Sequence, residues 1–253
     1  MGIFSPMWIA ISTYSILPTP KVDWTAENRS NALLFLPLVG IFVGAAMLLW
    51  CWICLRLNVP AALFASVSTL LPLLLSGGIH MDGFMDTMDA VASRQPAMRK
   101  LEIMKDSHAG AFAVMSCASY LLLNFGLYWT LYSEKFMLIA TIGFVVSRSV
   151  CVFSTFILPS ARENGFLVSM MEREKTQFGR TVMLLLSLLG MSAMIILDLF
   201  VGLIGTLTIG LILIFYCRMS KSQFGGITGD TCGFFIQLCE LSLLFGLWIG
   251  GII

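Results

Sequence analysis

Long continuous apolar runs most strongly limit what this chain can fold into. A membrane-spanning helix needs about 20 mostly apolar residues. Because the apolar residues are continuous rather than alternating with polar ones, the strands of a membrane β-barrel are a poor fit. We therefore expect an all-α polytopic membrane protein with about seven transmembrane helices, forming one integral domain. The seven predicted spans are residues 33–55, 60–76, 111–132, 136–158, 181–197, 201–217 and 233–252.

The composition agrees with this class and excludes several others. Hydrophobic residues make up 58% of the 253 residues and charged residues 11%, against roughly 25% charged residues in soluble domains. This excludes a soluble enzyme and a disordered protein. The net charge of +1 offers no basic field for a nucleic-acid partner. The seven cysteines lie mostly in apolar runs, so we expect buried free thiols.

The Lys and Arg residues predict the orientation in the membrane. When seven spans alternate, twelve of the 15 basic residues fall on one face, two (Arg56 and Lys135) fall on the other, and Arg148 lies within a span. Cytoplasmic loops are enriched in Lys and Arg. We therefore expect the basic face to be cytoplasmic. It comprises the N-terminal segment and the loops 77–110, 159–180 and 218–232.

The most informative stretch follows the second span and reads GGIHMDGFMDTMD over residues 77–89. If it is helical from about Asp82, then Asp82, Asp86 and Asp89 share one helix face. Like charges at this spacing repel, and a divalent cation between them would offset the repulsion. Carboxylate oxygens suit Mg²⁺, Mn²⁺ or Ca²⁺, and Mg²⁺ with a phosphorylated substrate indicates phosphoryl transfer. The alternative is a solvated acidic surface, against which the interleaved apolar residues argue.

Three residues that precede the acids, Gly77, Gly78 and His80, each have more than one possible role. Gly77 and Gly78 would permit close backbone approach to a substrate, or they simply end the second span. His80 is a candidate base, a metal ligand or an ordinary interfacial histidine.

A second polar cluster, LEIMKDSHAG, covers residues 101–110. Glu102 and Asp106 lie one helical turn apart, with Lys105 between them. One interpretation is an ordinary salt bridge between Glu102 and Lys105. The other is a phosphate-binding lysine beside metal-binding acids.

A third polar cluster, GGITGDTCG over residues 225–233, opens the last span. Glycines and hydroxyls before a helix N-terminus suit an anion, and Thr228 belongs to this set. Asp230 either caps the helix or completes the metal site. Within the spans, Arg148 and Glu240 need partners: each other, or a substrate phosphate for Arg148.

Taken in order, these segments resemble the cobalamin synthase family, the adenosylcobinamide-GDP ribazoletransferases, over most of the chain. Ile16, Ala90 and His108 depart from residues that are common in that family. The segments that carry the resemblance are residues 14–20 with Trp24, 36–40, 77–89, 101–107 with Gly110, 147–148, 161–165, and 225–230 with Glu240.

The resemblance implies a Mg²⁺-dependent transferase of late vitamin B12 synthesis, in a bacterial or archaeal cytoplasmic membrane. It would join α-ribazole, or its 5′-phosphate, to adenosylcobinamide-GDP and release GMP. The implied partners are the lipid bilayer, the corrinoid nucleotide and α-ribazole, with homo-oligomerisation left open. The implied catalytic residues are His80, Asp82, Asp86, Lys105 and Asp106; the metal ligands are Asp82, Asp86, Asp89, Glu102 and Asp106; and the substrate contacts are Gly77, Gly78, Lys105, Arg148, Arg162, Thr228 and Asp230.

Two other functions compete with this one. A CDP-alcohol phosphotransferase also places an Asp-rich, Mg²⁺-binding motif at the membrane surface, but here the Asp before Asp82-Gly83 and the later Ala-Arg of that family's pattern are missing. A cation-coupled transporter would use Arg148 and Glu240 at mid-membrane and show inverted repeats. The sequence has no visible repeat, and its charges gather on one face instead.

Overall fold

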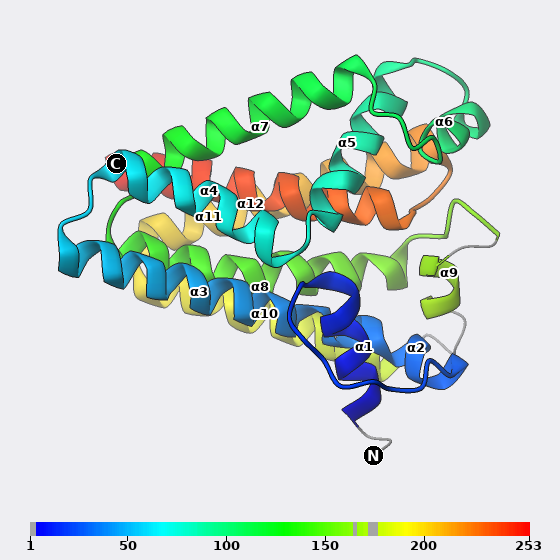
Figure 1. The fold of residues 1–253 in the computed structure, drawn as a ribbon, viewed down its shortest axis with the longest axis horizontal. Coiled ribbons are helices and arrows are strands. Elements are labelled where there is room, and N and C mark those ends of the chain that lie inside the picture. The colour runs from blue at the N-terminus through cyan, green and yellow to red at the C-terminus, as the bar shows by residue number, and fades with distance from the viewer. Residues whose placement is uncertain (1–3, 164–165, 172–176) are drawn as a thin grey trace.

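The computed structural model describes residues 4–163, 166–171 and 177–253, and within them it contains helices and no strand. This confirms the all-α expectation. Seven helices run along the long axis of a bundle (Figure 1). They are α3 (Leu36–Leu57), α4 (Ala61–Leu75), α7 (Ala111–Thr130), α8 (Glu134–Ile157), α10 (Gln177–Leu197), α11 (Leu199–Phe224) and α12 (Gly229–Ile252).

Each long helix coincides with one predicted span. Among the described residues, six candidate spans are long and apolar enough to cross a membrane, and the first of them runs from Ala26 to Leu57. The seventh, α4, has 15 residues and is followed by α5 (Ile79–Ala92), whose axis is bent away from it by 92°. Helix α11 extends seven residues beyond its predicted end at residue 217, so the bundle continues past the apolar run.

The short elements gather toward one end of the bundle. In Figure 1 they lie in the right-hand half, whereas the α3–α4 and α7–α8 turns and the C-terminus lie at the left end. This matches the predicted alternation of loops, although residues 164–165 and 172–176 of the predicted loop 159–180, including the Asn164-Gly165 of the family-like segment, lie outside the described part of the chain. The short elements are α1 (Ser5–Tyr14), α2 (Ala26–Ala32), the 3₁₀ helix η2 (Leu33–Phe35), α5, α6 (Ala97–Ile103) and α9 (Phe166–Met171).

The outer faces of the bundle are apolar, as a bilayer requires. Leu189 and Ile196 of α10 are 67% and 83% exposed, and Leu207 of α11 is 60% exposed. Exposed apolar surface of this extent is unfavourable in water and marks contact with another apolar phase. The arrangement supports a multi-pass membrane protein, with α12 at the centre packed against α5, α7, α8 and α11.

Candidate active site

The site begins with a sharp turn between α4 and α5. Gly77 and Gly78 have φ angles of +63° and +76°, a left-handed conformation that glycine adopts without strain. The turn sends α5 across the bundle at 92° to α4. The glycine pair therefore ends the second span, as one of its two interpretations holds, and the close backbone approach to a substrate stays a prediction. Both glycines also border a shallow surface hollow together with Asp82.

Helix α5 then touches the start of α12, a segment about 150 residues later in the chain. A Cβ atom placed on Gly83 would lie 2.6 Å from the backbone oxygen of Asp230, and one placed on Gly233 would lie 3.0 Å from that of His80. The two backbones are therefore in direct contact. This contact unites the first acidic segment with the third polar cluster, as the sequence interpretation of Asp230 allowed.

Three carboxylates, those of Asp82, Asp230 and Asp89, act on Asp86. Its own burial, followed by the negative charges of Asp82, Asp230 and Asp89, raises the pKa of Asp86 to about 7, and Arg162 partly offsets this. Arg162 Nη2 lies 3.4 Å from Asp230 Oδ2. The group is therefore acidic and incompletely balanced by Arg162, which is the electrostatic condition that favours binding of a divalent cation.

Asp89 has a structural contact of its own. Its Oδ2 accepts a 2.6 Å hydrogen bond from the backbone N–H of Gly110, and its Oδ1 accepts one of 2.8 Å from Ala113. These donors belong to the start of α7, where backbone N–H groups lack helical partners. Asp89 therefore acts as a remote cap that ties α5 to α7.

The second polar cluster is only partly brought to the site. Glu102 pairs with Arg99 at 2.6 Å rather than with Lys105, and Lys105 is exposed. Asp106 accepts hydrogen bonds from the ring Nδ1 and the backbone N–H of His108, at 2.8 Å and 3.0 Å, and these bonds lower the pKa of Asp106. Asp106 shares a hollow of about 310 Å³ with Asp86 and Asp89.

The five predicted metal ligands thus do not form one ready-made shell. Over the described residues, no three His, Cys, Asp or Glu side chains converge closely enough to hold a metal ion. Asp89 and Glu102 are engaged by α7 and by Arg99. The acids that remain grouped by their mutual charge are Asp82, Asp86 and Asp230, a set that includes Asp230, which sequence reasoning placed only as an alternative ligand.

The start of α12 explains why Asp230 is available. Thr228 is the N-cap, and its Oγ1 accepts from the backbone N–H of Thr231 at 3.1 Å while Thr231 Oγ1 accepts from the N–H of Thr228 at 2.8 Å. This reciprocal capping box satisfies the helix start. Capping is therefore the work of Thr228, and Asp230 in the first turn faces Arg162 instead, where the helix dipole also favours its negative charge.

A short backbone pairing places Arg162, and sequence reasoning missed it. Ile227 N–H donates to the Pro159 carbonyl and Ala161 N–H donates to the Ile227 carbonyl, both at 2.9 Å. A Cβ on Gly226 would lie 2.4 Å from the Pro159 oxygen, so the pairing needs glycine there. The Gly225-Gly226 pair was the one available signal for this close backbone approach. Nothing in the sequence indicated that the segment from Pro159 to Ala161 would be its partner.

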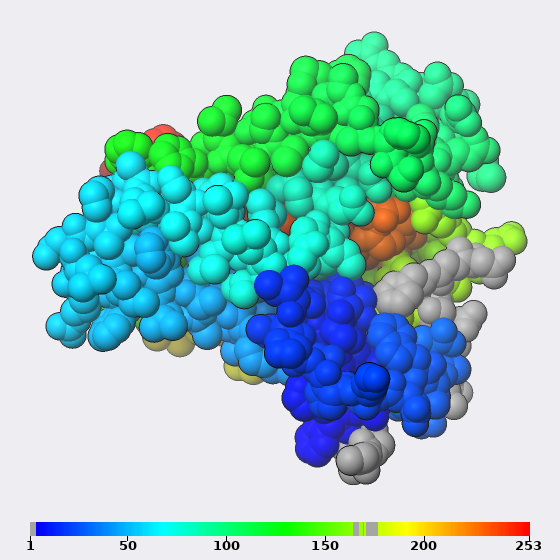
Figure 2. Space-filling view, in the orientation of Figure 1, coloured from blue at the N-terminus to red at the C-terminus, as the bar shows by residue number. Residues whose placement is uncertain are grey.

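One cavity of about 190 Å³ connects these groups. Figure 2 shows the orange start of α12 between α5 and the yellow-green segment that follows α8, and residues of these three segments line the cavity. Its polar lining includes Asp82, Arg162, Thr228 and Asp230. Its apolar lining, which sequence reasoning did not single out, comes from Leu33, Leu36, Ile79, Val152, Leu167, Val168 and Ile236.

His80 also lines this cavity. It is 3% exposed, and its ring lies 6.0 Å from that of Tyr14 in a stacked arrangement. Its Nε2 atom has no hydrogen-bond partner in the described structure. Burial and the charge of Arg148 lower the pKa of His80 to about 3. The imidazole is therefore neutral near pH 7 and offers one unused polar nitrogen.

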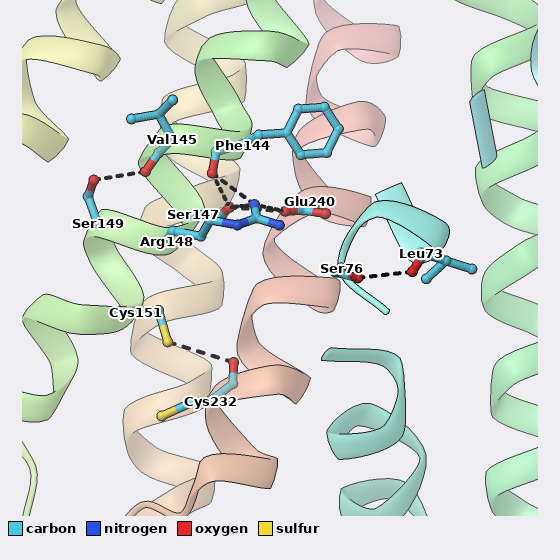
Figure 3. Close-up of polar contacts among 10 residues, drawn as sticks. All are labelled: Leu73, Ser76, Phe144, Val145, Ser147, Arg148, Ser149, Cys151, Cys232 and Glu240. Atoms are coloured by element: carbon cyan, nitrogen blue, oxygen red, sulfur yellow. Dashed lines mark hydrogen bonds and ion pairs between the residues drawn. The ribbon is translucent and has the colours of Figure 1, made fainter. Parts of the chain in front are cut away.

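Arg148 lies away from the cavity lining. It is 1% exposed, and its Nη1 lies 2.6 Å from Glu240 Oε1 and 2.9 Å from the carbonyl oxygen of Phe144 (Figure 3). Ser147 Oγ also donates to Glu240 at 3.2 Å. Of the two predicted partners for Arg148, the structure shows Glu240, so this pair joins α8 to α12 within the bundle.

Comparisons of the sequence with known proteins give matches along almost the whole chain. The family model described as cobalamin-5-phosphate synthase matches residues 6–248. Proteins named adenosylcobinamide-GDP ribazoletransferase match from Lachnoclostridium phytofermentans (36% identity; 95% of this chain and 92% of the relative), Desulfitobacterium hafniense (34%; 95% of each) and Acinetobacter baumannii (31%; 95% and 96%). No solved structure matches the chain. A family model that spans nearly every helix of the bundle, together with relatives of this identity, establishes that the chain belongs to the cobalamin-5-phosphate synthase family.

Proposed function

We propose that the protein joins α-ribazole, or its 5′-phosphate, to adenosylcobinamide-GDP and releases GMP, as a late step of vitamin B12 synthesis. The observation that carries this proposal is the contact between α5 and α12. It brings Asp82, Asp230 and Arg162 to the lining of one cavity, with Asp86 in the same acidic group. The names of the relatives support the substrates.

The reaction exchanges one phosphorus–oxygen bond for another. A hydroxyl oxygen of α-ribazole attacks the phosphorus that carries the corrinoid arm, a new O–P bond forms, and the bond to the leaving GMP breaks. The hydroxyl proton must be taken up, and GMP leaves as an anion. Such a transfer depends mainly on positioning and on charge neutralisation. Arg162 would neutralise the charge on the phosphate oxygens. Thr228 and the backbone N–H groups at the N-terminus of α12 would orient these oxygens.

The acidic residues fit a magnesium ion. Carboxylates are the hard oxygen ligands that Mg²⁺ prefers, and the pKa of Asp86 is raised first by burial and then by the negative charges of the neighbouring acids. Mg²⁺ is usually bound through one or two carboxylates together with water and substrate phosphate oxygens, so two of Asp82, Asp86 and Asp230 would suffice to hold the ion, which when bound would neutralise charge on the pyrophosphate. Glu102 is exposed and paired with Arg99, so we propose no metal contact for it.

The cytoplasmic face is the proposed location of this site. The polar loops at this end carry most of the basic residues, which favours a cytoplasmic orientation. Adenosylcobinamide-GDP, a nucleotide, and α-ribazole, a nucleoside, are both water-soluble and would then reach the cavity from the cytoplasm.

The test is GMP release by the full chain purified in detergent or liposomes. Adenosylcobinamide-GDP, α-ribazole and Mg²⁺ are supplied, with EDTA and omission of α-ribazole as controls. We expect GMP only when both Mg²⁺ and α-ribazole are present, together with a corrinoid that carries the lower base. Folded protein that releases no GMP, but releases CMP from a CDP-linked lipid, would overturn the proposal in favour of a phosphotransferase of lipid synthesis.

A further inference from the structure

The cavity beside the acids contains a buried polar group that the proposed reaction does not use. His80 is 3% exposed, and its Nε2 has no hydrogen-bond partner among the described residues. A buried polar atom without a partner costs free energy, so a fold that retains one has a reason to do so. The location of His80 on the cavity lining indicates that this reason is a ligand.

The cavity has two chemically different sets of walls. Asp82, Arg162 and Asp230 supply charge, and a larger set of aliphatic side chains with the Tyr14 ring supplies apolar surface. A ligand that satisfies both needs an apolar aromatic part joined to a hydroxylated or phosphorylated part. α-Ribazole has this form, since an apolar bicyclic base is attached to a ribose. The base also has one ring nitrogen that does not carry the ribose and can accept a hydrogen bond.

We propose that the apolar part of this cavity binds the aromatic base of α-ribazole, with His80 Nε2–H donating to the unsubstituted ring nitrogen. The inference rests on the proposed function and adds to it a residue that recognises the base. The ribose then lies toward Asp82, Arg162 and Asp230, where its hydroxyl can meet the phosphorus. His80 becomes a binding residue rather than a base or a metal ligand.

The size and polarity of the cavity favour this ligand over the other parts of the two substrates. Its volume of about 190 Å³ exceeds that of a ~150 Å³ apolar cavity that holds benzene, and it is far too small for a corrin ring. Guanine has several donors and acceptors on its edges, and burying them against aliphatic walls would leave most of them unpaired. A lipid acyl chain would fill the apolar part but leave His80 Nε2 without a partner.

The test compares α-ribazole with an isostere in which the unsubstituted ring nitrogen is replaced by a C–H group, giving the corresponding indole riboside. For wild-type protein with adenosylcobinamide-GDP and Mg²⁺, we expect kcat/KM to be about tenfold lower with the isostere, the effect of one hydrogen bond. In His80→Phe, which keeps an aromatic ring, the preference should fall to about twofold or less. In His80→Gln, which keeps a donor, part of the preference should return. In the wild-type protein, the lower kcat/KM with the isostere should come mainly from a higher KM. His108→Gln, at the chain's other histidine, should keep the wild-type preference.

A binding measurement keeps the inference testable if the His80 variants do not fold. With ¹⁵N-labelled histidine, the two histidines give separate ring signals, and His108→Gln assigns them. α-Ribazole should shift the Nε2 signal of His80, and the indole riboside should not shift it in the same way.

The outcomes separate the two proposals. If wild-type protein turns over both ribosides equally, or if His80→Phe keeps the tenfold preference, the His80 inference is overturned while the proposed function stands. If both ribosides leave the His80 signal unchanged, the apolar part of the cavity has another occupant, such as a lipid chain, and the inference is again overturned. If folded wild-type protein releases no GMP with α-ribazole, both proposals fail.

Discussion

Gly83 on α5 lies against Asp230 on α12, so closely that a Cβ at position 83 would stand 2.6 Å from the Asp230 backbone oxygen and 2.8 Å from its Cα. Both neighbours are backbone atoms in a helix, and they cannot turn aside as a flexible side chain would. The approach of the two helices is what brings the acids of α5 to Arg162 and Asp230. Because position 83 has no side chain, α5 and α12 can approach this closely, and the residues of the candidate site lie together.

Replacing Gly83 with Ala should accordingly damage both stability and activity. Overpacking of this kind typically costs 1–3 kcal/mol, and separation of α5 from α12 would displace Asp82 and Asp86 from Asp230. We expect a lower thermal midpoint in detergent and GMP release reduced about tenfold or more. Gly126→Ala on α7 is the matched control, because a Cβ there meets nothing within 4 Å; it should be neutral or stabilising by up to about 1 kcal/mol. Equal behaviour of the two variants would contradict the close-contact argument.

The buried pair of Arg148 and Glu240 predicts a large stability effect. Glu240→Gln leaves the guanidinium of a 1% exposed arginine without its counter-charge, which in buried sites costs about 3–5 kcal/mol. We expect a clear fall of the midpoint measured by thermal unfolding in detergent. Lys135→Met removes an exposed pair with Asp198 and should change stability by less than about 1 kcal/mol. If Glu240→Gln were as mild as this control, the pair would not join α8 to α12 as the structure indicates.

The sequence was sufficient for the fold because the bilayer imposes simple lengths on the spans. Even the short span 60–76 was recovered as α4 (Ala61–Leu75), since the distribution of basic residues required it. The sequence also predicted the Asp82–Asp86–Asp89 face and the Arg148–Glu240 pair.

What the sequence could not supply was contact between distant segments. The sequence suggested a metal beside Asp89, and only the structure shows that the start of α7, 21 residues later, donates a hydrogen bond to each of its oxygens. Glu102 had two basic neighbours within reach, and only the three-dimensional structure shows that Arg99 is its partner. The apolar residues that line the cavity belong to segments spread along the chain, from α1 to α12. Taken alone in the sequence, each of these residues looks like any other apolar residue.

Asp89 yields a prediction that separates capping from metal binding. Asp89→Ala removes two hydrogen bonds from the start of α7, and loss of such a cap costs about 0.5–2 kcal/mol. We expect a lower thermal midpoint that is the same in Mg²⁺ and in EDTA, because the loss is structural. Asp89→Asn keeps one acceptor oxygen, so its thermal midpoint should lie between those of wild type and Asp89→Ala. A destabilisation seen only in Mg²⁺ would instead assign Asp89 to the metal.

The raised pKa of Asp86 predicts a pH dependence of the metal-free protein. The folded-state pKa of about 7 lies above the ordinary value for Asp, so the folded state binds this proton more tightly than the unfolded chain does. Its contribution to stability is present at low pH and is lost as the pH rises through about 7. In EDTA, the midpoint should therefore be lower at pH 8 than at pH 6, Mg²⁺ should restore it at pH 8, and Asp86→Asn should show a smaller change with pH. A wild-type midpoint that rises over this interval in EDTA would contradict the assignment.

Asp82 is the decisive residue for the proposed chemistry, because it is exposed and lines the cavity, so its removal should spare the fold. Asp82→Asn keeps the size and removes the charge. If Asp82 helps hold Mg²⁺ on the pyrophosphate, losing it should raise the barrier by several kcal/mol, and about 2.7 kcal/mol already corresponds to a hundredfold lower rate. We expect GMP release to fall about a hundredfold or more while the thermal midpoint in EDTA stays near that of wild type. Glu102→Gln, at a carboxylate that pairs with Arg99 on the surface, is the matched control and should retain turnover. Near-normal turnover of Asp82→Asn at saturating Mg²⁺ would remove this residue from the metal site and leave Asp86 and Asp230 as its candidate ligands.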